Sequence, residues 1–399
     1  MKRLLFIAPC SYPVVIAECI VNMKLLQALS NAGEFEIDLV SRDHPHKLYK
    51  EVEPLESFHV KLDKVHVETL ERKINFKTIW LNFVTLLKFG FTFRGAHWAA
   101  QVLPLCEAWV KEKNYDYIVS KDYPSFLVAS YLKKHYQLKW VATWNDPYPF
   151  QLFPEPYGHW PNTKLSWVDR QKIRVMRQAD THIFPSDRLR DYMCKQLALP
   201  VSKTMIIPHV VVSPNSLNLK DAHLRLLVSG NMKKPRDLTL FLRALHQFYT
   251  LNPEAEMRVD ILGLVEDEVP GLIQELGLST YVNVLPSVSY NESLEIAKNH
   301  QVCILVEAPM AEGIYLPTKV SDFMQNGNVI FAISPSEGVL KDIYKEGYIG
   351  YFADNTKQEM ILEQINKIYQ DYRAGVIQNK ARVKPEYLDK AVVKQYLDL

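Results

Sequence analysis

The sequence predicts an α/β protein made of two Rossmann-like, doubly wound domains. Two observations carry this prediction: short apolar runs alternate with longer helical stretches, and the alternation restarts after residue 223. Short apolar runs are typical of strands buried on both faces of a parallel sheet. The length agrees, because 399 residues with 48% hydrophobic content exceed one ordinary core. We expect the two domains to face each other across a cleft.

The expected boundaries follow from the same pattern. Residues 1–208 should form the first domain, and residues 224–380 the second. Residues 211–223 are polar, Asn-rich and without periodicity, and residues 209–223 are expected to link the two domains. Residues 381–399 are expected to form a helix that crosses back to the first domain.

In the first half, apolar runs predict a series of strands with helical stretches between them. These runs are Leu4–Ala8, Glu36–Ser41, Tyr117–Ser120, Trp140–Thr143 and Thr181–Phe184. The helix that follows the first run should end at Gly33. The loop at residues 9–15 has no Gly-x-Gly-x-x-Gly, so the sequence does not predict a dinucleotide site.

Polar residues follow the strand predicted at Trp140–Thr143. Ligands of doubly wound sheets bind beyond the carboxyl ends of the strands, which is where Asn145 and Asp146 lie. Asp146 has two interpretations that the residues leave open. It accepts a proton from a substrate hydroxyl or orients that hydroxyl, or it caps the turn before Pro147.

Residues 76–98 are rich in aromatic side chains interleaved with basic ones. One interpretation is an amphipathic element in a lipid interface, where rings and cations both find partners. The other is a core helix, which we favour because a helix in an α/β layer needs an apolar stripe in any case.

The second half repeats the strand pattern, with runs at Leu224–Val228, Arg258–Leu262, Val282–Leu285, Val302–Leu305 and Val329–Ile333. Gly230 lets the chain turn sharply after the first of these runs. Lys233, Lys234 and Arg236 then place three cations at a helix start, where they either bind an anion or form a solvated basic loop.

A second helix start lies at residues 312–327. Pro317 should begin this helix and Gly327 should end it, with Thr318, Lys319 and Asp322 in its opening turns. Free backbone N–H groups, the helix dipole and Lys319 together suit a diphosphate, and Asp322 is then available to accept hydroxyl hydrogen bonds. The alternative is an ordinary loop-to-helix junction with a solvated lysine.

Charge and cysteine content restrict the partners and the compartment. The chain has a net charge of +2; 27 basic and 21 acidic side chains through residue 200 give +6, and 20 against 24 afterwards give −4. The basic half suits anionic lipid or an anionic acceptor, and nucleic acid is not indicated. Five scattered cysteines without Cys-x-x-Cys indicate a reducing cytosol and no zinc site. No run reaches the roughly 18 apolar residues of a membrane span, so any contact with the inner membrane face should be peripheral.

The residues at two places resemble a known family. Ser229-Gly230 followed by Arg236, and Leu316-Pro317-Thr318-Lys319 leading to Asp322 and Gly327, resemble GT-B glycosyltransferases of the group 1 type, family 4. The resemblance implies that a sugar moves from a nucleotide diphosphate sugar to a hydroxyl with retention. It also implies that no metal or cofactor is needed. The acceptor we expect is a lipid-linked or polysaccharide precursor glycan.

The resemblance also assigns roles to residues in the second domain. Arg236 and Lys234 would contact the donor diphosphate, and Lys319 would approach it from the helix start. Glu312 would meet the donor sugar and Asp322 the ribose, although nine residues separate them where the family has Glu-x7-Glu. Glu307 competes with Glu312 for its role. The full donor-binding set is Gly230, Lys234, Arg236, Pro317, Thr318, Lys319 and Asp322.

The acceptor is expected along the first domain. Its contacts would come from Ser11, Tyr12, Asp122 and Tyr123, beside the catalytic candidates Asn145, Asp146 and Glu312. Asn145 stands where many family members carry a histidine. Two alternatives therefore stay open: a nucleotide-sugar binding subunit without catalysis, and an inverting GT-B transferase or epimerase.

Overall fold

The structure is a computed structural model that describes residues 1–399 except 15, 44–53, 71–72, 159–164, 215 and 220–222. Val15 of the first predicted loop and parts of the predicted linker therefore lie outside the described residues. Contacts divide the chain into two compact units. Unit 1 holds Met1–Pro154, Gly158–Val210 and Asp389–Leu399, and unit 2 holds Glu155–Tyr157 and Val211–Leu388.

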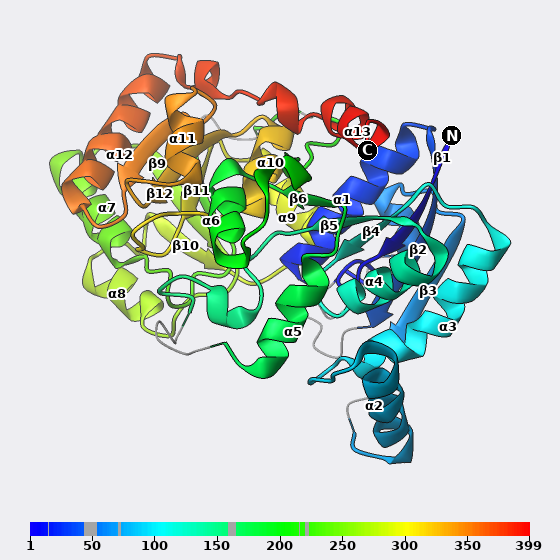
Figure 1. The fold of residues 1–399 in the computed structure, drawn as a ribbon. Helices are drawn as coiled ribbons and strands as arrows, with labels where there is room; N and C mark the ends of the chain where they lie inside the picture. The colour runs from blue at the N-terminus through cyan, green and yellow to red at the C-terminus, as the bar shows by residue number, and fades with distance from the viewer. Residues whose placement is uncertain (15, 44–53, 71–72, 159–164, 215, 220–222) are drawn as a thin grey trace. The chain divides into compact units, whose positions relative to one another are not determined.

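Unit 1 is built on a parallel sheet of seven strands in the order β3-β2-β1-β4-β5-β6-β7 (Figure 1). The strand order reverses between β1 and β4, which is the switch point of a doubly wound sheet. The strands are β1 (Lys2–Ile7), β2 (Phe35–Asp43), β3 (Lys64–Thr69), β4 (Tyr117–Lys121), β5 (Lys139–Thr143), β6 (Thr181–Phe184) and β7 (Thr204–Ile206).

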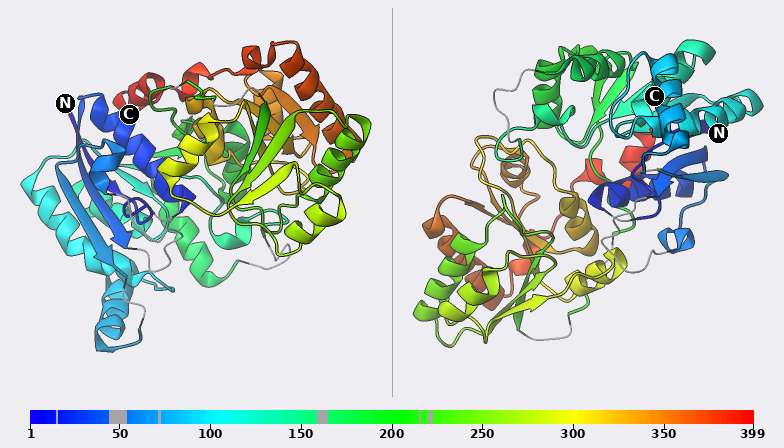
Figure 2. Two further views of the ribbon diagram at one scale, coloured as in Figure 1. Left: turned by 180° about the vertical axis from the view of Figure 1, so that it is seen from behind. Right: turned by 90° about the horizontal axis from the view of Figure 1, so that it is seen from below.

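Helices cover both faces of this sheet (Figure 2). The connection after β1 runs toward one edge and that after β4 toward the other, so right-handed crossovers place their helices on opposite faces. The helices are α1 (Ala17–Asn31), α2 (Phe76–Phe89), α3 (His97–Glu112), α4 (Ser125–Tyr136), α5 (Trp167–Met176), α6 (Asp187–Leu197) and α13 (Asp389–Leu397).

The last helix returns to unit 1. The sequence predicts a helix over residues 381–399, but the structure begins α13 at Asp389, after two short 3-10 turns. This helix packs against α1, and the Tyr117 hydroxyl donates a hydrogen bond of 2.6 Å to the Tyr396 carbonyl oxygen. A buried tyrosine of β4 thereby anchors the chain end to the sheet.

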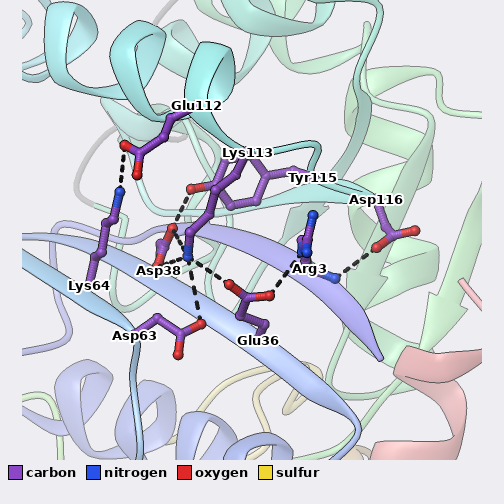
Figure 3. Close-up of polar contacts among 9 residues, drawn as sticks. All are labelled: Arg3, Glu36, Asp38, Asp63, Lys64, Glu112, Lys113, Tyr115 and Asp116. Carbon is purple, nitrogen blue, oxygen red and sulfur yellow. Dashed lines mark hydrogen bonds and ion pairs between the residues drawn. The ribbon is translucent and has the colours of Figure 1, made fainter.

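Charged side chains join the amino ends of the strands of unit 1 (Figure 3). The Lys113 ammonium lies 2.8 Å from Glu36 and 3.1 Å from Asp38, which is only 1% exposed. The Tyr115 hydroxyl donates to Asp38, and the Arg3 side chain donates to Glu36 at 2.9 Å. These contacts lie at the edge opposite the carboxyl ends, so we interpret them as stabilising the sheet.

The favoured prediction of a core helix at residues 76–98 is wrong for its first part. Within α2 only Thr78 and Thr85 are buried, while Phe76 is 84% and Trp80 55% exposed. The apolar stripe faces away from unit 1, because the helix turns its small polar side chains inward. Trp98, in α3, is fully buried as predicted.

Unit 2 contains a second parallel sheet, with six strands in the order β10-β9-β8-β11-β12-β13. Its order reverses between β8 and β11. The strands are β8 (Leu224–Ser229), β9 (Met257–Leu262), β10 (Val282–Leu285), β11 (Val302–Val306), β12 (Val329–Ser334) and β13 (Tyr351–Asp354). The helices are α7 (Thr239–Leu251), α8 (Val269–Glu275), α9 (Tyr290–Lys298), α10 (Thr318–Asn326), α11 (Val339–Lys345) and α12 (Gln358–Arg373).

Alternate residues of the unit 2 strands enter two different cores. Leu226 and Val228 pack with residues of α7 and α12, whereas Leu227 packs with residues of α10 and α11. The strands are apolar throughout because both faces are covered, as the unbroken apolar runs predict. Both units are Rossmann-like, and the predicted fold class is confirmed.

Candidate functional site

The predicted donor residues gather at the switch point of unit 2. Gly230 follows β8 and Glu307 follows β11, the two strands between which the order reverses. The loop after β8 also carries Arg236, and α10 begins at Thr318. The sheet therefore brings together segments that are almost 90 residues apart in the chain, at the place where such folds bind ligands.

Gly230 lies between the loop after β9 and the Lys319 side chain. Its φ is +131°, and the loop after β9 passes so near that a Cβ on Gly263 would lie 2.4 Å from the Gly230 carbonyl oxygen. On the other side, a Cβ on Gly230 would lie 3.8 Å from Cε of Lys319. Because these two glycines have no side chains, the loops after β8 and β9 pass close to each other, and the aliphatic part of the Lys319 side chain lies close to Gly230.

Helix α10 has the predicted limits. Pro317 precedes its first residue with extended backbone, and Gly327 ends it in the left-handed conformation at φ +74°. No side chain caps its amino end. Its first-turn N–H groups are thus free of a side-chain cap beside Lys319, which is the arrangement that favours an anion.

Arg236 forms an ion pair that the sequence does not indicate. Its guanidinium donates to Oε1 of Glu307 at 3.2 Å and also approaches the Asn231 carbonyl oxygen at 3.5 Å. Glu307 is 9% exposed, and burial raises the pKa of its carboxyl despite Arg236, which acts in the opposite direction. Lys234, the weaker candidate, hydrogen-bonds Glu266 through its backbone N–H at 2.5 Å.

The loop that carries Glu312 is hydrogen-bonded to the loop after β12 and to the start of α11. The Gly313 N–H donates to the Glu337 carbonyl oxygen at 2.9 Å, and the Val339 N–H donates to the Gly313 carbonyl oxygen at 2.8 Å. Gly338 completes this bridge with a φ of +152°. Glu312 is exposed next to the bridge, so its carboxylate is accessible from solvent.

Asp322 lies in the interior, which differs from the expected position beside ribose hydroxyls. It is 2% exposed and accepts a hydrogen bond of 2.8 Å from the Tyr290 hydroxyl of α9. Glu312 is exposed while Asp322 is buried. The structure therefore does not present these two carboxylates together to solvent.

In unit 1 the predicted catalytic residue Asn145 pairs with a carboxylate of α1. Its amide donates to both carboxylate oxygens of Glu18, each at 2.6 Å. Lys121, at the end of β4, is only 3% exposed and places its ammonium 3.7 Å from Glu18. Lys121 and Asn145 also line a pocket with His209.

Two further carboxylates surround this group. Asp122 adopts a left-handed backbone conformation at φ +61°, and burial, followed by the charge of Glu18, raises the pKa of its carboxyl well above the usual range. The charge of Asp146 raises that pKa further, whereas Lys121 lowers it. Asp146 itself is exposed. The carboxyl ends of β4 and β5 therefore present a hydrogen-bonding, acid-rich surface.

The predicted acceptor residues differ in accessibility. Ser11 is fully buried, and its hydroxyl has no hydrogen-bond partner among the described residues. The Tyr12 N–H donates to Ser41 at 3.1 Å, and the side chain of Tyr12 is half-buried. The Tyr123 ring stacks on Tyr148 at 5.0 Å, and burial raises the pKa of its phenol.

Sequence reasoning missed Glu18 and Tyr290. An acidic residue in the first turn of a helix is ordinary, so nothing marked Glu18 as a partner of Asn145, 127 residues away. Tyr290 contacts Asp322 across two helices that no local pattern joins.

The part of the chain that the structure describes has neither a metal-binding cluster nor a membrane-spanning helix. Among them, no three or more His, Cys, Asp or Glu side chains are grouped so that they could hold a metal ion. Within the same residues, no helix has both the length and the apolar content needed to cross a membrane.

A known sequence family matches part of the first half of the chain. Residues 20–212 match the sequence family described as Glycosyltransferase Family 4. No curated protein matches the chain. The predicted resemblance to family 4 is thus confirmed over these residues.

Solved structures match the whole chain at low sequence identity. Sucrose-phosphate synthase from Thermosynechococcus elongatus aligns with a TM-score of 0.66 at 14% identity, covering 100% of this chain and 98% of the other. Anabaena HepE in complex with UDP aligns with a TM-score of 0.68 at 14% identity, covering 100% and 99%. The lipopolysaccharide outer core galactosyltransferase WaaB gives 0.61 at 12% identity, covering 100% and 98%. The chain therefore has the GT-B fold.

Proposed function

We propose that this protein is a glycosyltransferase that moves a sugar from a nucleotide diphosphate sugar to a hydroxyl group, with unit 2 binding the donor. One observation carries the proposal: Gly230, Arg236 and Lys319 converge at the switch point of unit 2, beside the open helix start of α10. The match of residues 20–212 to a glycosyltransferase family and the fold shared with HepE, which was solved with UDP, support it.

The proposed role of this site is to stabilise the leaving diphosphate. Negative charge accumulates on that group as the glycosidic bond breaks, and fixed donors stabilise it most where water is excluded. Lys319 and the first N–H groups of α10 approach from one side, and Arg236 from the loop after β8. We propose that these groups act without a metal ion and that the reaction retains the anomeric configuration.

The ion pair between Arg236 and Glu307 is compatible with binding a phosphate. The guanidinium has five N–H donors, so it can keep Glu307 while turning others toward a phosphate. Exposed Glu312 is proposed to contact the donor sugar. We assign buried Asp322 to holding α10 in place through Tyr290, in place of a ribose contact.

Unit 1 is proposed to receive the acceptor. Asp146, which is exposed beside Glu18 and Asp122, is the candidate to orient an acceptor hydroxyl, and Ser11, Tyr12 and Tyr123 border the same loops. A lipid-linked or polysaccharide precursor glycan is the proposed acceptor class. Peripheral contact with an anionic inner membrane face belongs to the same proposal.

The test compares Lys319→Ala with Lys345→Ala, a matched loss of one lysine charge on an exposed position of α11. UDP, GDP, ADP and TDP, with their sugars, are first screened by thermal shift, because a bound ligand raises stability. Removing one donor to developing charge costs about 3–4 kcal/mol, so Lys319→Ala should lower turnover at least about a hundredfold. Equal turnover in both variants would rule out the assigned site.

One observation favours a second candidate, a nucleotide-sugar binding subunit without transfer. Asn145 occupies the expected catalytic position, and its amide is already bonded to Glu18. Transfer or hydrolysis of a radiolabelled donor by the purified protein would exclude this candidate. The anomeric configuration of the product, measured by NMR, then tests retention against an inverting transferase or an epimerase.

A further inference from the structure

Helix α2 of unit 1 is amphipathic, but it exposes its apolar face and covers its polar face, which is the reverse of a helix packed on a core in water. Residues three, four and seven apart form one stripe along it, and all are exposed apolar side chains: Phe76, Ile79, Trp80, Phe83, Leu86 and Leu87. Such a stripe normally packs on a core. Here the helix projects away from the sheet of unit 1 (Figure 1), and its apolar side chains are exposed.

The inward face of α2 explains this orientation. Thr78 and Thr85 are the buried residues of the helix, and the Asn82 amide donates to the Thr78 carbonyl oxygen at 2.8 Å. The Thr92 hydroxyl, just beyond the helix, donates to the Asn82 side-chain oxygen at 3.0 Å. These bonds lie within α2 and between α2 and the residues that follow it, so the covered face of the helix is polar and its exposed face carries the apolar stripe.

The charges around the stripe select the partner. Lys73, Lys77 and Lys88 lie in or beside α2, and residues 73–106 contain no Asp or Glu. Exposed aromatic side chains with flanking lysines suit the boundary between anionic lipid headgroups and acyl chains. A second copy of the same helix would instead bring lysines together without an acidic partner.

The base of α2 is continuous with the proposed acceptor loops. Gly90 ends the helix, Phe91 is buried, and the Phe93 ring packs against Tyr123 at 4.8 Å. Tyr123 in turn stacks on Tyr148, which follows Asn145 and Asp146. The rings of Phe93, Tyr123 and Tyr148 thus connect the carboxyl end of α2 to the loops that carry the candidate acceptor residues.

We propose that α2 docks this protein on an anionic bilayer by burying its apolar stripe at the headgroup–acyl boundary. The proposal rests on the proposed function in one respect: docking would bring a lipid-linked acceptor close to these loops. Docking itself requires neither donor nor acceptor, so it is testable alone.

The experiment is flotation of the full chain with phosphatidylcholine vesicles that do or do not contain phosphatidylglycerol. The full chain should bind the anionic vesicles, and Trp80→Ser combined with Phe83→Ser should lower the partition coefficient at least about tenfold. Val201→Ser with Leu251→Ser is the matched control, because both residues are exposed apolar side chains elsewhere. The control should partition like the unaltered chain.

A second arm tests the charge argument with Lys73→Ala and Lys77→Ala. Each lysine near the surface contributes about a fivefold change in binding to anionic vesicles, and the difference between the two vesicle types should shrink accordingly. Thermal shift with UDP should be unchanged in all α2 variants, which separates docking from donor binding. Failure of the full chain to float, equal flotation of Trp80→Ser/Phe83→Ser, or self-association that this variant abolishes would each overturn the proposal.

Discussion

Replacing Gly338 by alanine tests whether the loop that carries Glu312 belongs to the donor site. A Cβ at Gly338 would lie 2.7 Å from the Gly313 carbonyl oxygen and 2.8 Å from its Cα and N. Such distances force the backbones apart, and a φ of +152° with ψ near 180° is accessible almost only to glycine.

The expected cost follows from the bridge that must open. Backbone strain contributes about 1–3 kcal/mol, and the two hydrogen bonds that Gly313 shares with Glu337 and Val339 contribute about 1 kcal/mol each. Either the strain is retained or the bridge opens, so we expect Gly338→Ala to lose roughly 2–3 kcal/mol of unfolding free energy in urea. With the loop displaced, calorimetric titration should show UDP-sugar affinity reduced at least about tenfold.

Gly347→Ala is the control for this experiment. Gly347 also has a left-handed φ, +84°, but the nearest atom to its added Cβ is a guanidinium nitrogen of Arg382 at 3.7 Å. It should therefore cost only about 1 kcal/mol of strain and leave UDP-sugar affinity unchanged. The reasoning is refuted if Gly338→Ala binds UDP-sugar as tightly as Gly347→Ala, or if it unfolds at the same urea concentration as the unaltered chain.

Two other predictions concern stability. Burial lowers the pKa of His182 from 6.5 to about 4, so the unfolded chain takes up a proton first as pH falls, and up to about 3 kcal/mol of stability present above pH 6.5 is lost by pH 4. Urea unfolding across this range should be less pH-dependent in His182→Gln, and an unchanged slope would contradict the assignment. Lys113→Met leaves buried Asp38 without its cation and should cost about 3 kcal/mol, whereas Lys64→Met, whose partner Glu112 is exposed, should cost under about 1 kcal/mol. Equal losses in these two variants would show that Lys113 is not the main support of the network.

The sequence predicts the limits of a helix closely where a proline or a glycine stands at its end. The helix expected from Pro317 to Gly327 is α10, because a proline at the start and a glycine at the end act on the backbone at their own positions. The strand at Lys64–Thr69 was not predicted. It is the edge strand β3, partly exposed along its length, so it has no continuous apolar run.

Contacts between distant segments account for what the sequence did not indicate. The partners Arg236 and Glu307 are 71 residues apart, and Asn145 and Glu18 are 127 apart, so their spacing carries no signal. The aromatic stripe at residues 76–89 can be recognised in the sequence, but the sequence does not show whether it faces the core or the solvent. The stripe faces solvent because Thr78 and Thr85 are the buried residues of the helix, and the spacing of apolar residues does not predict which face is buried.

The charge of each half of the chain differs from the charge at its switch point. Residues through 200 carry +6, yet the loops after β4 and β5 gather Asp122 and Asp146 beside Glu18. The remainder carries −4, yet its switch point presents Arg236 and Lys319. Each place also holds the opposite charge, because Lys121 lies beside Glu18 in unit 1 and Glu307 pairs with Arg236 in unit 2. Since fold alone does not define function, the proposal of a diphosphate in unit 2 and a hydroxyl acceptor in unit 1 depends on these individual groups and not on the net charge of either half.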